Sequence, residues 1–356
     1  MIRLLIVDDS ALIRKLLGEI FARAGGFEVR VARDGLAALE QNRSFAPDVV
    51  TLDLDMPRMD GLTCLDRLMV ERPCPVVIVS SHSLPGAEAT LKAFELGAVD
   101  VMPKPGGPVS LHMDEWAPRL VAKVRGAARA KVRSSLRLRE RVRQRIGAAL
   151  AAAPSAPARA LRPMAEGDGL VLVGASTGGP PALEALLTAL PASFPWPILV
   201  AQHMPASFTG ALARRLDKLC ALAVIEVREP VPLQPGMVYI GAGDADLLVS
   251  RRDAALVAMA APPLPAHLWH PSADRLVASA MEELAPARII GILMTGMGND
   301  GAAAMAELHA RGGHTIAEAE ETAAVWGMPG ELVKAGGAEW VEPLPDIAAR
   351  LLAMVP

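Results

Sequence analysis

Three polar side chains in the second half of the sequence have the types required for acyl transfer. Ser176 lies in the turn Gly-Ala-Ser-Thr-Gly after the apolar run GLVLV, His203 follows PILVA, and Asp300 follows RIIGILMTGMG. A strand that ends in such a turn before a helix presents a hydroxyl beside the N–H groups of the helix N-terminus. We therefore predict a Ser–His–Asp site without a cofactor: His203 takes the proton of Ser176, Asp300 orients the imidazole, and the serine attacks an ester or amide carbonyl.

The oxyanion of such a reaction requires backbone donors, which we expect near Thr177 and near Met297-Gly298. The Gly-x-Ser-x-Gly pattern alone is weak evidence, because glycine-rich turns also bind phosphate or simply reverse the chain. The order Ser–His–Asp argues against the α/β-hydrolase superfamily, but triads are recognised by role rather than by order. The remaining histidines of this half compete as bases or as substrate contacts: His267, His270, His309 and His314.

A second set of polar side chains belongs to the first hundred residues. Asp8 and Asp9 end the first apolar run, Asp53 ends the third, Ser80 ends VVIVS, and Lys104 follows the fifth. In a parallel sheet these positions meet at the carboxyl edge, where three carboxylates repel one another. Mg²⁺ together with the lysine would balance their charge. Each acid alone could be a helix cap, but their order favours a magnesium site.

The segments around these residues predict an α/β protein with two doubly wound domains. Residues 1–125 alternate short apolar strands with amphipathic helices, as in a flavodoxin-like (βα)5 domain. Residues 126–166 are expected to form a linker, first basic and then rich in Ala and Pro. Residues 167–356 predict a larger, parallel α/β hydrolytic domain, with a β-hairpin insert near residues 235–260.

Composition and charge exclude several other classes of protein. The three cysteines are odd in number and widely spaced, which fits neither a disulfide framework nor a zinc site. Neither a signal peptide nor an apolar run of about 18 residues is present, so we expect a cytoplasmic protein with no direct membrane insertion. Residues 119–145 hold eleven Arg and Lys. They lack interleaved aromatics, so a tether or a docking segment for an acidic partner is favoured over nucleic-acid binding.

The segments DD, DLDMPRMDG, VSS and KP resemble the receiver domain of two-component response regulators. The resemblance implies that a histidine kinase phosphorylates Asp53 and that Asp8, Asp9 and Asp53 hold Mg²⁺ with the carbonyl of Asp55. It also implies that Ser80 and Lys104 contact the phosphoryl oxygens. Val101 departs from this pattern, because many receivers carry an aromatic residue three positions before the lysine.

The segments GASTGGP, AQHMP, HPSADRL, TGMGNDGA and VWGMP resemble the catalytic domain of the chemotaxis protein-glutamate methylesterases, the CheB type. The resemblance implies hydrolysis of glutamyl methyl esters on the cytoplasmic helices of chemoreceptors, and often deamidation of receptor glutamines. It assigns Ser176 as nucleophile, His203 as base and Asp300 as orienting acid. Phosphorylation of the receiver is then expected to open access to the site.

Two departures from this second pattern point to the receptor-binding surface: His270 replaces a common arginine, and Glu318 lies in AEAE instead of AQDE. They leave substrate choice less determined than the chemistry. Two alternative functions therefore stay open. One is a non-enzymatic response regulator whose second half is a binding module, and the other is a serine hydrolase of a non-chemotactic pathway.

Overall fold

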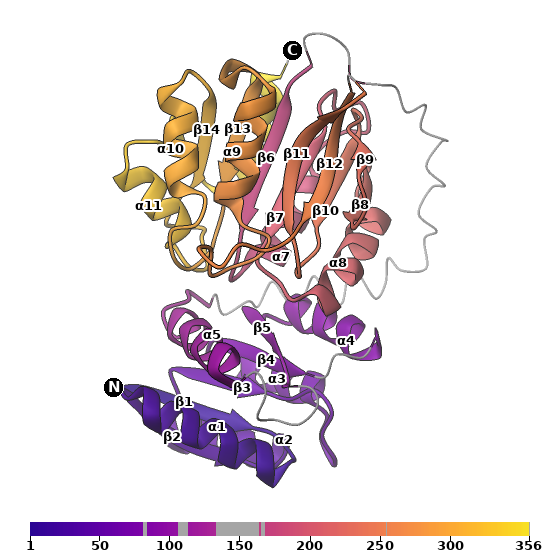
Figure 1. Cartoon of the computed structure of the whole chain (residues 1–356). Helices are drawn as coiled ribbons and strands as arrows, with labels where there is room; N and C mark the ends of the chain where they lie inside the picture. The colour runs from indigo at the N-terminus through magenta and orange to yellow at the C-terminus, as the bar shows by residue number, and fades with distance from the viewer. Residues whose placement is uncertain (81–83, 106–112, 133–163, 165–167, 254, 356) are drawn as a thin grey trace. The chain divides into compact units, whose positions relative to one another are not determined.

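The computed structural model describes residues 1–80, 84–105, 113–132, 164, 168–253 and 255–355. The chain divides into two compact units, Met1–Ala160 and Leu161–Pro356 (Figure 1). Most of the predicted linker lies outside the described residues, so the boundaries proposed for it remain predictions. No helix within the described ranges is long and apolar enough to cross a membrane.

The first unit is a five-stranded parallel sheet of order β2-β1-β3-β4-β5. This is the flavodoxin-like order, so the prediction for this domain is confirmed. The strands are β1 (Ile2–Val7), β2 (Phe27–Ala32), β3 (Val49–Leu52), β4 (Val76–Ser80) and β5 (Asp100–Pro103). The helices are α1 (Ala11–Ala24), α2 (Gly35–Phe45), α3 (Gly61–Glu71), α4 (Leu84–Glu95) and α5 (Met113–Ala127).

Side-chain caps start three of these helices close to the carboxyl edge of the sheet. Ser10 accepts a hydrogen bond from the backbone N–H of Ile13, and Asp34 and Asp60 cap α2 and α3 in the same way. Such caps satisfy N–H groups that have no partner inside the helix. The cap at Ser10 starts α1 immediately after Asp8 and Asp9, which leaves the two acids in the loop beyond β1.

The second unit is built on a seven-stranded parallel sheet of order β15-β14-β13-β6-β7-β10-β8. Its strands are β6 (Leu170–Ala175), β7 (Ile198–Gln202), β8 (Ala223–Val227), β10 (Met237–Gly241), β13 (Ile289–Leu293), β14 (His314–Glu318) and β15 (Trp340–Glu342). Its helices are α7 (Gly179–Thr188), α8 (Ala206–Leu219), α9 (Ala273–Glu283), α10 (Ala302–Ala310), α11 (Met328–Lys334) and α12 (Leu344–Met354), with a short 3-10 helix at Pro286–Arg288. Strands β6, β7 and β13 are buried throughout, as expected when helices cover both faces.

A small antiparallel sheet forms the insert, in the order β11-β12-β9. It consists of β9 (Val231–Pro232), β11 (Asp246–Arg252) and β12 (Ala255–Ala261). The hairpin predicted for this region is confirmed for β11 and β12. The prediction was wrong for β10, which pairs in parallel with β7 and β8, because its five buried residues suit a strand covered on both faces.

The strand order of the second unit determines where its polar loops meet. Strand β6 lies between β7 and β13, with Ala175 opposite Gln202 and Gly174 opposite Leu293. The chain leads from β6 to β7 on one side and from β13 to β14 on the other. Ligand sites in such sheets form where the direction changes, beyond the carboxyl ends of the strands. The loops that carry Ser176, His203 and Asp300 therefore leave the sheet side by side.

Candidate active site

Ser176 occupies the tight turn between β6 and α7. Its backbone N–H donates to the carbonyl of Thr295 at 2.9 Å, and its own carbonyl accepts from the N–H of Gly179 at 2.8 Å. The turn passes through Gly178, whose φ of 80° is a left-handed conformation that glycine adopts without strain. The serine is almost fully buried at the start of α7.

His203 follows β7 and is joined to the serine turn through the backbone. Its N–H donates to the carbonyl of Ala175 at 2.9 Å, and the Gln202 side chain donates to the carbonyls of Ser176 and His203 at 3.0 and 3.2 Å. The ring Nε2 lies 2.8 Å from Asp300 Oδ2. The other ring nitrogen, Nδ1, is buried and has no hydrogen-bond partner in the structure.

Asp300 receives hydrogen bonds on both carboxylate oxygens. Oδ2 accepts from His203 Nε2 and from the N–H of Ala273 at 2.6 Å, while Oδ1 accepts from Ser272 Oγ at 2.8 Å and from the N–H of Asp274 at 3.2 Å. Burial raises the pKa of Asp300, but the hydrogen bonds from His203, Ala273 and Ser272 outweigh burial and bring the pKa down to about 2. The carboxylate lies at the N-terminus of α9, where a negative charge is favoured.

These contacts bring His203 and Asp300 together as a bonded pair, as the sequence predicted. The described hydrogen bonds do not include one between Ser176 Oγ and His203. The serine is brought to the pair by backbone contacts instead. In enzymes without bound substrate, catalytic hydrogen bonds are often long or poorly aligned, so the geometry is compatible with a triad.

The residues predicted to bind the oxyanion lie in the serine turn and in the loop after β13. Thr177 is buried, and its carbonyl accepts from Thr295 Oγ1 at 2.8 Å. Met297 and Gly298 follow in the loop after β13, where Gly298 has a φ of 86°. A Cβ atom at Gly296 would lie 2.8 Å from the Cβ of Ser176, so this loop packs directly against the serine.

The structure adds residues that sequence reasoning missed. Thr295 ties the serine turn to the loop at Val325, because its hydroxyl accepts from the N–H of Val325 at 3.0 Å. Trp269 stacks on the His203 ring with a centroid distance of 6.1 Å and an interplanar angle of 18°. The position of Thr295 before Gly-Met-Gly was the only sequence signal for it.

The expectation about Glu318 as a substrate contact needs correction, whereas the one about His270 stays a prediction. Glu318 ends β14 with none of its surface exposed, and its Oε2 accepts from the N–H of Thr295 at 2.8 Å. It therefore supports the active-site loop from within and does not belong to a receptor-binding surface. The side chain of His270 is only 11% exposed, and its Nδ1 bonds Asp246 at 2.9 Å.

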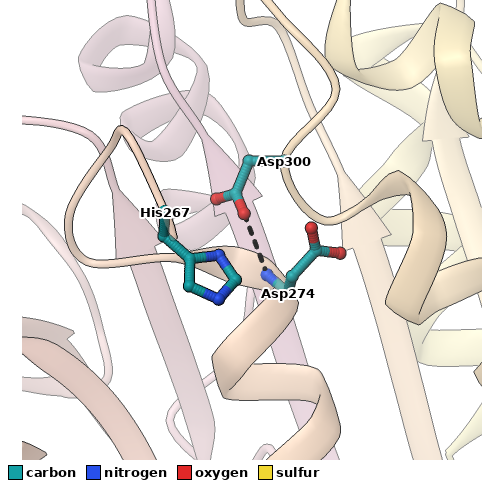
Figure 2. Close-up of side chains that lie close together, drawn as sticks. All are labelled: His267, Asp274 and Asp300. Carbon is teal, nitrogen blue, oxygen red and sulfur yellow. Dashed lines mark hydrogen bonds between the residues drawn. The ribbon is translucent and has the colours of Figure 1, made fainter. Parts of the chain in front are cut away.

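A further group of possible metal ligands includes Asp300 of the His203–Asp300 pair. His267, Asp274 and Asp300 each offer a ligand atom, and these atoms lie within 4.8 Å of one another (Figure 2). Burial raises the pKa of Asp274, and the nearby charge of Asp300 adds to the increase. Both oxygens of Asp300 already accept two hydrogen bonds each, which fits an orienting acid better than a metal ligand.

The first unit brings its acidic residues together at the carboxyl edge of its sheet. Lys104 Nζ lies 2.9 Å from Asp8 Oδ2 and 2.8 Å from Asp53 Oδ2. Burial raises the pKa of Asp53, although the hydrogen bond from Lys104 opposes the increase. Ser80 belongs to the same edge, since its carbonyl accepts from the N–H of Lys104 at 2.8 Å.

The donor set of this edge fits a magnesium ion. Ligand oxygens of Asp8, Asp9 and Asp53 lie within 4.8 Å of one another. Asp53 Oδ1 and Ser80 Oγ are buried without a hydrogen-bond partner. Carboxylate oxygens are the ligands that Mg²⁺ prefers. Val101 is buried within β5, so it contributes to the core beneath this site.

Known protein families match both units. Residues 171–351 match the CheB methylesterase family and residues 4–114 match the response regulator receiver domain. A protein-glutamate methylesterase/protein-glutamine glutaminase of Rhodopseudomonas palustris is 56% identical over 99% of this chain and 98% of its own length. One from Rhodospirillum rubrum is 52% identical over 99% and 96%. The CheB methylesterase catalytic domain of Thermotoga maritima covers 53% of this chain and all of its own, with a TM-score of 0.51 and 35% identity.

Proposed function

We propose that this chain, which belongs to the CheB methylesterase family and carries a receiver domain, is a phosphorylation-activated protein-glutamate methylesterase. Its substrates are glutamate methyl esters on the cytoplasmic helices of chemoreceptors. Receptor glutamines are a second substrate, which it deamidates. The observation that supports this most directly is the bond between His203 Nε2 and Asp300 Oδ2, placed beside the turn that carries Ser176.

Ester hydrolysis begins at Ser176. Its Oγ attacks the ester carbonyl while His203 Nδ1 takes the hydroxyl proton. Nδ1 has this role because Nε2 donates to Asp300, which leaves the lone pair of the ring on Nδ1. When the tetrahedral intermediate collapses, the C–O bond to the methoxy group breaks and His203 returns the proton, so methanol leaves.

Water then completes the cycle. His203 Nδ1 takes a proton from water as its oxygen attacks the acyl-enzyme, and the proton passes to Ser176 Oγ as the free glutamate leaves. Deamidation follows the same steps with ammonia as the leaving group. Backbone N–H groups near Thr177 and Met297-Gly298 stabilise the oxyanion, because both segments adjoin Ser176.

The first unit supplies the control. Asp53 accepts a phosphoryl group from a histidine kinase. Asp8, Asp9 and Asp53 would hold Mg²⁺, together with the carbonyl of Asp55. The ion, when bound, neutralises charge on the phosphoryl oxygens. Lys104 and Ser80 contact the same oxygens, and the unpartnered Ser80 hydroxyl is available for this bond. Phosphorylation shifts the population of the chain toward a form that admits the receptor.

Release of methanol from receptor membranes carrying labelled methyl esters tests the proposal. The full chain should release methanol, and Ser176→Ala should abolish the release. A serine-directed fluorophosphonate should label the wild type but not the variant. Absence of both reactions in the wild type would favour the binding-module alternative. Labelling without methanol release would favour a hydrolase of another pathway.

A further inference from the structure

Ser272 lies between two buried carboxyl groups of the second unit. Its side chain caps α9 and its whole surface is buried. The hydroxyl donates to Asp300 Oδ1 at 2.8 Å, while the backbone N–H donates to Asp246 Oδ1 at 2.7 Å. One residue therefore connects the orienting acid of the triad to the first residue of β11.

The direction of each hydrogen bond follows from the charges. A hydroxyl has one proton, and Asp300 as an anion can only accept, so Ser272 donates to it. Ser272 Oγ is then the acceptor toward His267, whose Nδ1 lies at 3.2 Å and must carry the proton. A series of hydrogen bonds thus runs from His267 through Ser272 to Asp300 Oδ1, and each residue donates to the next. Asp300 Oδ2 accepts from His203.

Asp246 holds the backbone of Ser272 in place. It is fully buried, and its Oδ1 also accepts from His270 Nδ1 at 2.9 Å, while its Oδ2 pairs with Arg275. Three donors from the segment 270–275 thus converge on one carboxylate: the Ser272 N–H, the His270 ring and the Arg275 guanidinium. This arrangement holds the turn that precedes α9 against β11 and limits how far Ser272 can move.

The four bonds on Asp300 divide into two kinds. The N–H groups of Ala273 and Asp274 belong to the helix backbone, and each donates to one oxygen of the carboxylate. Ser272 Oγ is the one side-chain group that donates to Oδ1, and Oδ1 is the oxygen that does not contact His203. Holding Oδ1 leaves Oδ2 directed at Nε2.

We propose that Ser272 is a positioning residue of the esterase: its hydroxyl holds the Asp300 carboxylate in the orientation that bonds His203, and Asp246 holds Ser272. The proposal rests on the proposed function for its substrate but not for its geometry. Without the hydroxyl, the carboxylate turns and the imidazolium formed during acylation loses part of its stabilisation. The loss affects the chemical step and leaves receptor binding unchanged.

The test compares Ser272→Ala with the wild-type full chain on methylated receptor membranes. We expect kcat to fall about tenfold or more, the effect of losing a hydrogen bond to a charged group, with KM within about twofold. We also expect the midpoint of the acid limb of the pH–kcat profile to move. Ser272→Thr, which keeps the hydroxyl and a good helix cap, should restore both.

Two further variants separate positioning from stability. Ser279→Ala removes a hydroxyl from the same helix, where it donates to Leu276 and accepts from the N–H of Val249, and should leave kcat unchanged. Ser272→Gly replaces the alanine variant if that protein does not fold, because glycine is nearly as good a cap as serine. For Ser272→Gly, both the thermal unfolding temperature and kcat are measured.

The pH dependence of fluorophosphonate labelling provides a readout that needs no receptor. If receptors release no methanol yet Ser176 labels, the proposed function fails while the labelling rates of the variants still test Ser272. An unchanged kcat, an unmoved pH midpoint, or no restoration by Ser272→Thr would each overturn the positioning role. A loss of kcat shared by Ser279→Ala would do the same.

Discussion

His203 Nε2 and Asp300 Oδ2 are 2.8 Å apart, so Asp300 binds the ring nitrogen that is farther from the backbone. The nitrogen nearer the backbone, Nδ1, is buried without a hydrogen-bond partner, and the backbone N–H of His203 donates to Ala175, the residue before Ser176. In the serine proteases the acid binds Nδ1 and the serine faces Nε2. In a neutral imidazole either ring nitrogen can donate while the other accepts, so the exchanged arrangement still leaves one nitrogen free to act as the base.

Replacement of Asp300 by asparagine should change the tautomer of His203. The amide can donate to Nε2, which moves the ring proton to Nδ1 and leaves no lone pair for the serine. We expect kcat for methanol release to fall about 10³- to 10⁴-fold. Asp217→Asn is the matched control, because Asp217 Oδ1 accepts from the N–H of Val224 away from the triad. A loss of less than tenfold in Asp300→Asn would contradict the orienting role.

The low pKa of Asp300 should appear in the acid stability of the second unit. A carboxyl whose pKa drops from 3.8 to about 2 on folding stabilises the fold by on the order of 2 kcal/mol above pH 4. This contribution disappears as pH falls from about 4 to about 2. Urea unfolding followed by tryptophan fluorescence should show a difference between wild type and Asp300→Asn that shrinks over this range. A difference that stays constant with pH would refute the assignment.

Replacement of Gly296 by alanine should disturb the nucleophile through packing alone. The added Cβ would lie 2.8 Å from the Ser176 Cβ and would also meet Met328 Sδ. We expect a loss of about 1–3 kcal/mol in the free energy of unfolding and slower fluorophosphonate labelling of Ser176. Gly18→Ala is the control, because nothing lies within 4 Å of its Cβ position in α1. Equal labelling rates in both variants would show that the loop yields without moving Ser176.

Replacement of Asp53 by asparagine should uncouple the esterase from phosphorylation. An amide cannot form the acyl phosphate, so the ratio of methanol release with and without a small acyl phosphate and Mg²⁺ should fall to about one. Asp66→Asn, which changes an exposed acid on α3, should keep the wild-type ratio. Stimulation that persists in Asp53→Asn would place the phosphorylation site elsewhere.

The pattern of apolar runs ending in polar residues was sufficient to predict much of this protein. It placed Ser176, His203 and Asp300 at three strand ends, and Asp8, Asp53 and Lys104 at the edge of another sheet. Both predictions depend only on the rule that parallel strands bring their carboxyl ends to one edge. Residue type and order were therefore enough to predict the His203–Asp300 pair and the contacts of Lys104 with Asp8 and Asp53.

Sequence could not determine which atoms of those side chains bond. The choice of Nε2 over Nδ1 depends on a contact between residues 97 positions apart. The bridge from Asp246 through Ser272 to Asp300 depends on contacts across 26 and 28 positions, which no local pattern encodes. Glu318 was expected at a surface and is buried, since β14 places it beneath Thr295. Packing in the folded protein determines which polar groups are removed from water. Those buried groups must then bond one another, so their hydrogen-bond partners are determined only by the tertiary structure.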